Sequence, residues 1–385
     1  MIYADSIPHH FSNNIIEVDN MSHFIFSSPR KYVQGRGVLD ELGEQLKPLG
    51  TKAFLMADST VWDIIGQRVD ASLKQASIGY HYERFNGEAS SNEITRLAKL
   101  ARDAGTNIVV GLGGGKTLDT AKAVADELKH NVAIVPTVAS TDAPCSALSV
   151  IYTDDGVFES YRFYNKNPDL VLVDTAVCAQ APARLFASGI ADGLATFVEA
   201  QAVQRSHALS MVGGKPTLAG MAIAETCETT LLTYGYSAYK AVEKGVVTPA
   251  VESVVEANTL LSGLGFENGG LAGAHAIHNG FTAIKGDIHH LTHGEKVAYG
   301  TLTHMVLEQR PDEEIAHYIR FYRAINMPTL LKDLHLENEP FENLLKVGEL
   351  ACSDADTLKN LDSQLTAEDV AHAIVAVDAF SKTIA

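Results

Sequence analysis

The spacing of hydrophobic residues changes near residue 180, and this change limits the possible folds more than any other feature of the sequence. From about residue 50 to 175, short β-branched runs alternate with amphipathic stretches. The runs predict buried parallel strands, which are hydrophobic throughout, at residues 52–57, 106–111, 131–135 and 169–173. Helices packed on the sheet are predicted at residues 92–104 and 117–128, where apolar residues recur every three or four positions. This part is therefore expected to be α/β and Rossmann-like.

After about residue 182 the strand pattern ends and a helical period replaces it, most clearly at residues 218–233 and 249–264. A chain of 385 residues also exceeds the usual size of one compact core, which favours two domains. We predict a polar N-terminal extension, an α/β domain and an all-α domain, at residues 1–20, 21–181 and 182–385. The junction near 180–183 is expected to be tight, with a cleft beside it in which ligands bind.

The charge of the chain excludes some classes of partner. It has 30 Lys and Arg residues against 47 Asp and Glu, a formal net charge of −17. Such a charge repels a phosphate backbone and an anionic membrane surface, so neither nucleic acid nor membrane is expected as a partner. The sequence also lacks a tract of 18 consecutive apolar residues, which a membrane-spanning helix would need.

The cysteines and the N-terminal residues indicate a cytoplasmic protein. The four cysteines lie far apart, at positions 145, 178, 227 and 352, and form no C-x-x-C pair. Neither a disulfide framework nor a thiolate zinc site is therefore expected. No Lys or Arg precedes Arg30, which is unlike a secretory signal or a transit peptide.

A glycine-rich segment follows the predicted strand at 106–111 and leads into the next helix. Its glycines let backbone N–H groups approach a pyrophosphate, and the helix N-terminus supplies partial positive charge. A plain strand-to-helix turn would have the same composition. Two known phosphate-loop patterns do not fit: a Walker A loop needs Gly where Val110 stands, and G-x-G-x-x-G needs Gly where Lys116 stands. ATP chemistry is thereby disfavoured.

Two further segments of this half could contact a dinucleotide. Asp58 ends the strand at 52–57, where a carboxylate can accept hydrogen bonds from ribose hydroxyls and repel a 2′-phosphate. An Asp in this place can equally be a helix N-cap. The hydroxyl-rich stretch 136–144 follows another strand, although alone it would be an ordinary loop with a helix cap.

The second half contains a pattern of candidate metal ligands. His275 lies in a small-residue helix at 270–280, and His293 begins another helix eighteen residues later. Asp192 lies in the small, apolar stretch 188–195, and Asp is rarely buried unless it is paired or bound to metal. Three N/O ligands from separate helices, with a fourth position open, are typical of a catalytic Zn²⁺ site.

These segments resemble a known family. Residues 113–122, GGGKTLDTAK, resemble the dinucleotide loop of the iron-containing alcohol dehydrogenase superfamily, and the segments around the three candidate ligands resemble its zinc-dependent glycerol dehydrogenases. The resemblance runs from about residue 21 to the C-terminus. It implies a dehydroquinate synthase-like architecture with an NAD-binding domain and a helical, metal-binding catalytic domain. It also implies a homo-oligomer, an octamer, that oxidises glycerol reversibly to dihydroxyacetone by hydride transfer to NAD.

The resemblance assigns roles residue by residue. Asp192, His275 and His293 are the zinc ligands, and the substrate binds beside both histidines. Asp142 faces the polyol and accepts hydrogen bonds from it, with Phe266 as an apolar wall. The implied NAD contacts are Asp58, Gly113, Gly114, Gly115, Lys116, Thr117, Leu118, Asp119, Thr137, Ser140, Ser146, Leu148 and Tyr152.

The resemblance also bears on the choice of metal. The superfamily's iron-dependent members carry an additional His four residues after the matching Asp, where this chain has Thr196. Zinc with three ligands is therefore favoured over iron with four, and such a Zn²⁺ would help an alcohol hydroxyl lose its proton before hydride transfer. His278, His289 and His290 are left open between proton relay, support of the ligands and plain packing.

Three alternatives stay open beside this interpretation. A related vicinal-diol dehydrogenase would have the same residues. A 3-dehydroquinate synthase or glycerol-1-phosphate dehydrogenase would need a basic pocket for an anionic group, which the acidic Asp142 disfavours. A non-catalytic NAD-binding sensor would have no need of a complete metal triad.

Overall fold

A six-stranded parallel sheet forms the first half of the protein. The computed structural model describes residues 23–385, so the extension predicted at 1–20 lies outside the described residues. The strands are β1 (Tyr32–Gly35), β2 (Lys52–Ala57), β3 (Gly79–Arg84), β4 (Ile108–Gly113), β5 (Asn131–Pro136) and β8 (Leu170–Asp174). Their order across the sheet is β1-β8-β5-β4-β2-β3, and each neighbouring pair is parallel.

Helices cover both faces of this sheet. Successive side chains along each strand point to opposite faces of the sheet. Phe54 and Val109 therefore pack on one face, and Leu55 and Val110 on the other. The first face is covered by α3 (Ser91–Asp103) and α4 (Gly115–Leu128), and the second by α1 (Leu42–Leu46) and α2 (Ser59–Gln75). The core of the first face continues into the helical half, which joins the two halves firmly.

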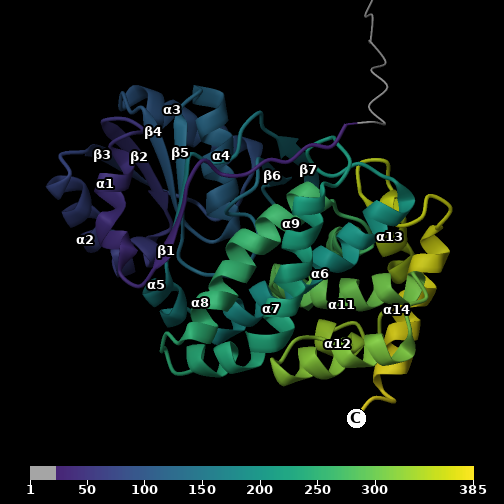
Figure 1. The fold of residues 1–385 in the computed structure, drawn as a ribbon. Coiled ribbons are helices and arrows are strands. Elements are labelled where there is room, and N and C mark those ends of the chain that lie inside the picture. The colour runs from purple at the N-terminus through teal and green to yellow at the C-terminus, as the bar shows by residue number, and fades with distance from the viewer. Residues whose placement is uncertain (1–22) are drawn as a thin grey trace, which may run out of the picture.

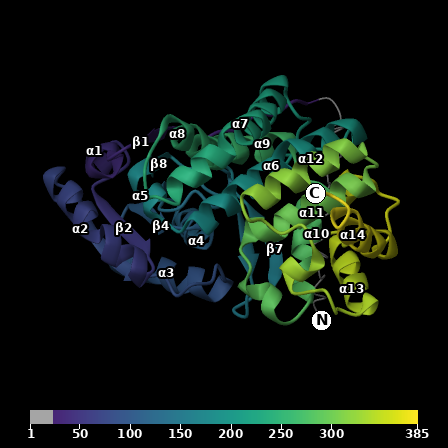
Figure 2. The ribbon, with the colours of Figure 1, turned by 90° about the horizontal axis from the view of Figure 1, so that it is seen from below.

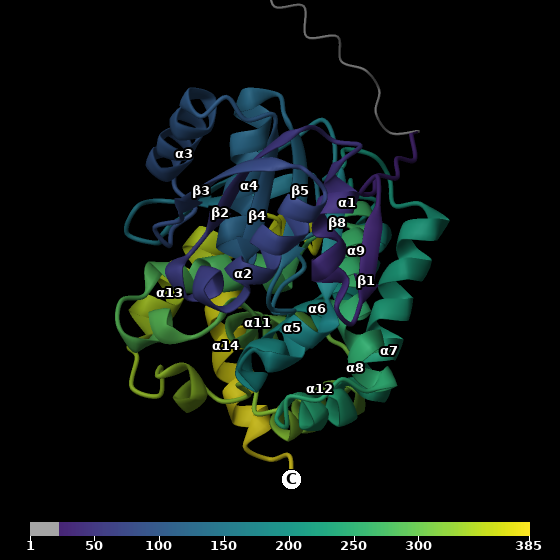
Figure 3. The ribbon, with the colours of Figure 1, turned by 90° about the vertical axis from the view of Figure 1, so that its left-hand side faces the viewer.

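The second half is helical and is built around α6 (Ala183–Ser206), which packs against α7 (Leu218–Val242), α9 (Ser262–Gly269) and α11 (His293–Leu307). It follows α5 (Thr175–Gln180), the short helix after the sheet. The other helices are α8 (Pro249–Glu256), α10 (Gly273–Gly280), α12 (Asp312–Ala324), α13 (Phe341–Ala351) and α14 (Ala367–Ser381). A π-helical turn at Ala257–Leu261 links α8 to α9 without a break. The C-terminal helix and α12 lie at the opposite end of the molecule from α3 (Figure 3).

A hairpin and an N-terminal segment connect the halves. The antiparallel strands β6 (Leu148–Tyr152) and β7 (Phe158–Phe163) lie between the sheet and the helices, as Figures 1 and 2 show from two directions. Before β1, the chain pairs at Phe24 with Lys215, and the Ser27 N–H donates to Asn268 Oδ1 at 2.7 Å. Residues from one end of the sequence thereby contact the helical half before entering the sheet.

The predicted fold class, an α/β part followed by a helical part, is confirmed. Each predicted strand is present with ends shifted by at most two residues, and the helix predicted at 218–233 continues to Val242. The last strand of the sheet, β8, ends at Asp174, and the elements after it are helical, while the division into separate domains near residues 180–183 stays a prediction. Among residues 23–385, none of the helices has the length and hydropathy to cross a membrane.

Candidate active site

The three predicted metal ligands meet at one point of the helical half. Asp192 comes from the middle of α6, His275 from α10 and His293 from the first position of α11. Their ligand atoms all lie within 4.8 Å of one another. Asp192 Oδ1 is 3.3 Å from His275 Nε2 and 3.0 Å from His293 Nε2. Two imidazole nitrogens and one carboxylate aimed at a common centre match the donor set of a catalytic zinc site.

Glycines let the three helices approach closely enough for this. A Cβ atom on Gly294, directly after His293, would lie 1.9 Å from the Ser188 carbonyl oxygen of α6. A Cβ on Gly300 would lie 2.4 Å from the Ala274 carbonyl oxygen of α10. The backbone of α11 therefore rests directly on α6 and α10, and the ligands on them are held at short range.

The charges around this point fit a bound cation. Burial raises the pKa of Asp192, but the imidazoles of His293 and His275 outweigh it and hold that pKa well below its usual range. Burial, followed by the negative charge of Asp192, raises the pKa of the neighbouring Asp142 well above its usual range. Two carboxylates are thus buried side by side, and a divalent cation would offset the repulsion between them.

Asp142 is held at the cluster by the loop after β5. Its N–H donates to Asp192 Oδ2 at 3.1 Å, and its own Oδ2 accepts from the Ser262 hydroxyl at 3.4 Å. The Asn258 side chain, in the π-helical turn, donates to the Ala139 carbonyl at 2.8 Å and fixes the same loop. Asp142 is therefore positioned from the helical half as well as from the sheet.

Thr196 contacts a hydroxyl and lies outside the set of ligand atoms. Its Oγ1 is 2.8 Å from the Ser262 Oγ, and its side chain is fully buried. Through this contact Thr196 supports Ser262, whose hydroxyl in turn donates to Asp142.

A small cavity adjoins the cluster and has one apolar wall. Phe266 packs with Leu148 and Leu271 to form this wall. The polar side chains that line the cavity come from α4, the loop after β5, the hairpin, α10 and α11. They are Asp119, Asp142, Ser146, Tyr152, Tyr161, His275, Asn279 and His293. The structure therefore brings Asp142 and Phe266 together with the histidines, as the resemblance implies.

A cleft of about 590 Å³ lies at the carboxyl ends of the strands. Its lining includes Asp58 after β2, Gly114 after β4 and both Thr137 and Ser140 after β5. This is the edge at which parallel α/β sheets bind ligands, and the volume is typical of such a site. A second hollow, lined by Gly115, Lys116, Asp119, Tyr152 and His293 among others, continues toward the metal cluster. Several of the proposed NAD contacts therefore line the cleft, and others line the hollow beside the candidate metal ligands.

Some of the predicted cofactor residues have their side chains engaged elsewhere. The Asp119 carboxylate is paired with Lys122 Nζ at 2.8 Å and accepts from the Val150 N–H at 3.0 Å, which ties α4 to the hairpin. Leu118 packs in the hydrophobic core, so only its backbone is available, and the Thr117 side chain is buried too. Asp58 caps α2 by accepting from the Val61 N–H at 2.9 Å, and it lines the cleft at the same time.

The remaining histidines separate into two groups. His278 is buried with its ring edge-on to that of His293, at 4.2 Å between centroids, and burial lowers its pKa well below the usual value. His289 and His290 are exposed in the 3-10 turn Asp287–His290 and lie outside the ligand cluster. Of the three, only His278 is placed to support a ligand.

Sequence reasoning missed Glu199, Tyr161 and Asn279. Glu199 lies two helical turns after Asp192 on the same face of α6, and its Oε2 is 2.5 Å from His275 Nδ1. An acid seven residues after a candidate ligand, inside an apolar helix, was the available signal. The sequence around Tyr161 contains no comparable signal, because this residue lies on β7, a strand that was not predicted. Its hydroxyl accepts a hydrogen bond from the Asn279 side chain at 2.9 Å.

This chain is similar to members of one enzyme family. The family described as iron-containing alcohol dehydrogenase matches residues 29–175. A glycerol dehydrogenase of Escherichia coli is 49% identical over 93% of this chain and 97% of its own length. A glycolaldehyde reductase of Halobacterium salinarum is 47% identical over 94% of this chain and 98% of its own.

The fold is similar as well. The crystal structure of glycerol dehydrogenase from Schizosaccharomyces pombe superposes with a TM-score of 0.89 at 45% identity, covering 94% of this chain and 92% of that one.

Proposed function

Because the chain belongs to the iron-containing alcohol dehydrogenase family, among whose members it is close to glycerol dehydrogenases, we propose that it interconverts glycerol and dihydroxyacetone with NAD. In the forward direction, glycerol and NAD⁺ give dihydroxyacetone, NADH and a proton. The observation that carries the proposal is the meeting of Asp192, His275 and His293 beside Asp142, at the inner end of the strand-edge cleft.

We propose Zn²⁺ as the metal of this cluster. Asp192, His275 and His293 would hold it, leaving a position open for an alcohol oxygen. When bound, the ion supplies Lewis-acid chemistry, which lowers the pKa of an alcohol hydroxyl beside it. Thr196, in the place of the fourth ligand of iron-dependent relatives, supports the choice of zinc because its hydroxyl is engaged with Ser262.

The protein's own groups orient the two reactants. Asp142 accepts hydrogen bonds from the polyol hydroxyls that do not react, and Phe266 packs against its carbon chain. The backbone N–H groups at Gly114 and Gly115, at the start of α4, bind the pyrophosphate. Tyr152 and His293 line a hollow beside the candidate metal ligands and would hold the nicotinamide there. When bound, the cofactor would supply the hydride chemistry, and the protein would bind and orient the two reactants.

A second candidate substrate follows from the comparison with the Halobacterium enzyme, whose name describes reduction of glycolaldehyde. Absorbance of NADH, followed with glycerol, 1,2-propanediol and simple alcohols, and in reverse with dihydroxyacetone and glycolaldehyde, separates the two activities. We expect the largest kcat/KM with glycerol and dihydroxyacetone. A larger value with glycolaldehyde would favour the second candidate, and no turnover of any of these by zinc-loaded protein would favour a sensor.

Replacement of Asp58 is expected to change the choice between NAD and NADP. The carboxylate lines the cleft, where it can bond the adenosine ribose and repel a 2′-phosphate. In Asp58→Ser, kcat/KM for NAD should fall while that for NADP stays level or rises. Measuring kcat/KM for both cofactors in both proteins gives the ratio that tests this expectation.

Asp58→Asn is the matched variant, because Asn retains the cap on α2 and removes only the charge. It should lower the NAD to NADP ratio as well. If neither variant lowers the ratio, Asp58 is only a helix cap and the selectivity lies elsewhere.

Assembly into an octamer stays a prediction of the resemblance.

A further inference from the structure

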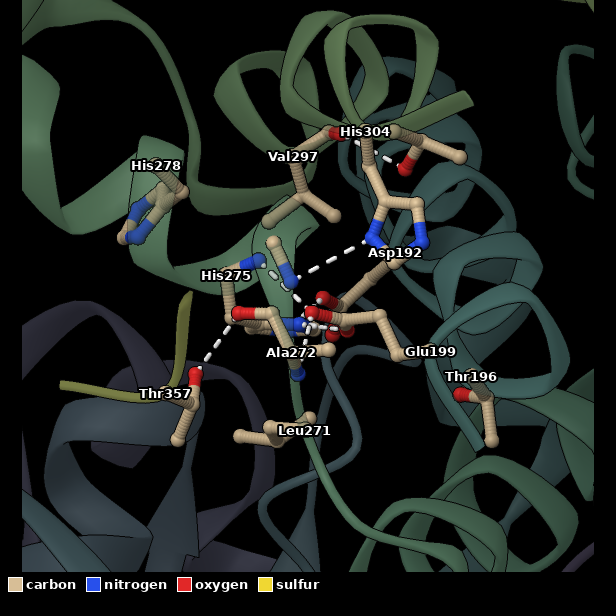
Figure 4. A network of polar contacts seen from close by, with 12 residues as sticks. Asp192, Thr196, Glu199, Leu271, Ala272, His275, His278, Val297, His304 and Thr357 are labelled. Carbon is tan, nitrogen blue, oxygen red and sulfur yellow. Dashed lines mark hydrogen bonds and ion pairs between the residues drawn. The ribbon is translucent and has the colours of Figure 1, made fainter. Parts of the chain in front are cut away.

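Behind the candidate ligand His275 lies a further buried carboxylate, that of Glu199 (Figure 4). Glu199 is fully buried on α6, and its Oε2 is 2.5 Å from His275 Nδ1, the ring nitrogen that faces away from the cluster. The other ring nitrogen of His275, Nε2, is the one that lies near Asp192. The imidazole thus spans two carboxylates, one in the cluster and one behind it.

The other oxygen of Glu199 is fixed by the protein backbone. Its Oε1 accepts from the N–H of Ala272 at 2.9 Å and from the N–H of His275 at 3.0 Å, at the start of α10. Both groups can only donate, so this position requires an oxygen. Consequently the carboxylate cannot rotate without losing two hydrogen bonds, and Oε2 stays directed at Nδ1.

We propose that Glu199 is the positioning residue that keeps the proton of His275 on Nδ1, which leaves the Nε2 lone pair free for the metal. A neutral imidazole carries one N–H, and the hydrogen bond made by one nitrogen decides which nitrogen can bind a metal. An acceptor fixed at 2.5 Å from Nδ1 selects the tautomer that the cluster needs. The proposal rests on the metal centre of the proposed function.

The start of α10 has other anchors that do not involve Glu199. The Gly273 N–H donates to His304 Nδ1 at 3.2 Å, and the Thr357 hydroxyl donates to the Ala272 carbonyl at 2.8 Å. Both contacts appear in the network of Figure 4. A change confined to the Glu199 head group should therefore leave α10 in place.

Glu199→Gln tests the proposal because it reverses one contact while keeping the shape. The amide oxygen must stay with the two backbone N–H groups, so the NH₂ group turns toward Nδ1. Two donors then face each other, and the imidazole proton moves to Nε2, where it blocks the metal. Affinity for Zn²⁺, measured by competition with a chelator, should fall by about 10–100-fold. The visible spectrum of the Co²⁺-loaded protein should weaken at equimolar metal.

Glu93→Gln is the matched control. Glu93 lies on α3, is also buried, and accepts a hydrogen bond from a backbone N–H, that of Asn86. Its Zn²⁺ affinity should equal that of the unaltered protein. The midpoint of thermal unfolding without metal should be similar in both variants, which separates positioning from stability. Unchanged Zn²⁺ affinity in a folded Glu199→Gln protein would overturn the proposal.

A measurement on the unaltered protein covers the case in which the variant fails to fold. Neutron diffraction from zinc-loaded crystals should locate a hydrogen on His275 Nδ1 directed at Glu199. A bare or metal-bound Nδ1 would overturn the proposal. If the unaltered protein binds neither Zn²⁺ nor Co²⁺, the metal centre of the proposed function has failed instead.

Discussion

Prolonged chelation should abolish glycerol oxidation, and added Zn²⁺ should restore it. The three candidate ligands are side chains that would hold the ion by coordination alone, so an excess of chelator can withdraw it from the folded protein. Without it, the alcohol hydroxyl keeps the high pKa that it has in water, and hydride transfer stops. The measurement is the NADH absorbance rate alongside the metal content by elemental analysis. Full activity in protein shown to be free of metal would end the zinc proposal.

His275→Ala should have the same effect by removing a ligand. We expect loss of bound metal and a fall in kcat/KM of more than ~100-fold, because loss of even an outer partner of a ligand costs 10–100-fold. His289→Ala is a suitable control, since that histidine is exposed and lies outside the cluster. Its metal content and activity should match those of the unaltered protein.

Asp142→Asn should weaken glycerol turnover while leaving NAD binding nearly unchanged. A hydrogen bond to a charged group contributes roughly 1.5–3 kcal/mol, so kcat/KM for glycerol should fall by about 10–150-fold. NAD binding should be spared because the outer part of the cleft, near Asp58, is formed by other residues. Steady-state kinetics with glycerol, and a separate titration of NAD, measure the two quantities.

Asp169→Asn controls for the loss of a buried carboxylate. Asp169 is as buried as Asp142 and accepts from the Val132 N–H at 2.9 Å, at the start of β5 and away from the metal cluster. Its variant should retain the glycerol kcat/KM. If Asp142→Asn also retained it, Asp142 would have no place in the substrate site.

The fold was predictable where burial is complete. After their first residues, Lys52 and Asn131, the strands at 52–57 and 131–135 are fully buried, so the residues that follow are apolar and their pattern is unambiguous. β3, Gly79–Arg84, lies at the sheet edge with a half-buried surface, and its mixture of Tyr, His and charged residues gives no such pattern. The hairpin β6–β7 depends on contacts with two halves of the protein, which local sequence does not record.

The cluster of candidate metal ligands was predictable because its residues are chemically unusual in their surroundings. A lone Asp among small apolar residues, and a His inside a helix of Gly and Ala, have few other roles. The supporting groups were harder to find. Glu and Ser are common in helices, so Glu199 and Ser262 do not stand out in the sequence. Their contacts, with His275 and with Asp142, depend on which segments pack beside α6 and α9.

The glycine contacts between α6, α10 and α11 have a consequence for how the sequence can vary. A single methyl group at Gly294 or Gly300 would collide with a backbone oxygen that has no room to move. Likewise, a Cβ on Gly189 would lie 2.0 Å from the Ala139 carbonyl oxygen, in the loop that leads to Asp142. In a library of single substitutions, these three positions should therefore be as intolerant as the ligands, although none has a side chain to offer the reaction. The set of positions that tolerate no substitution would therefore be larger than the set of residues that take part in the reaction.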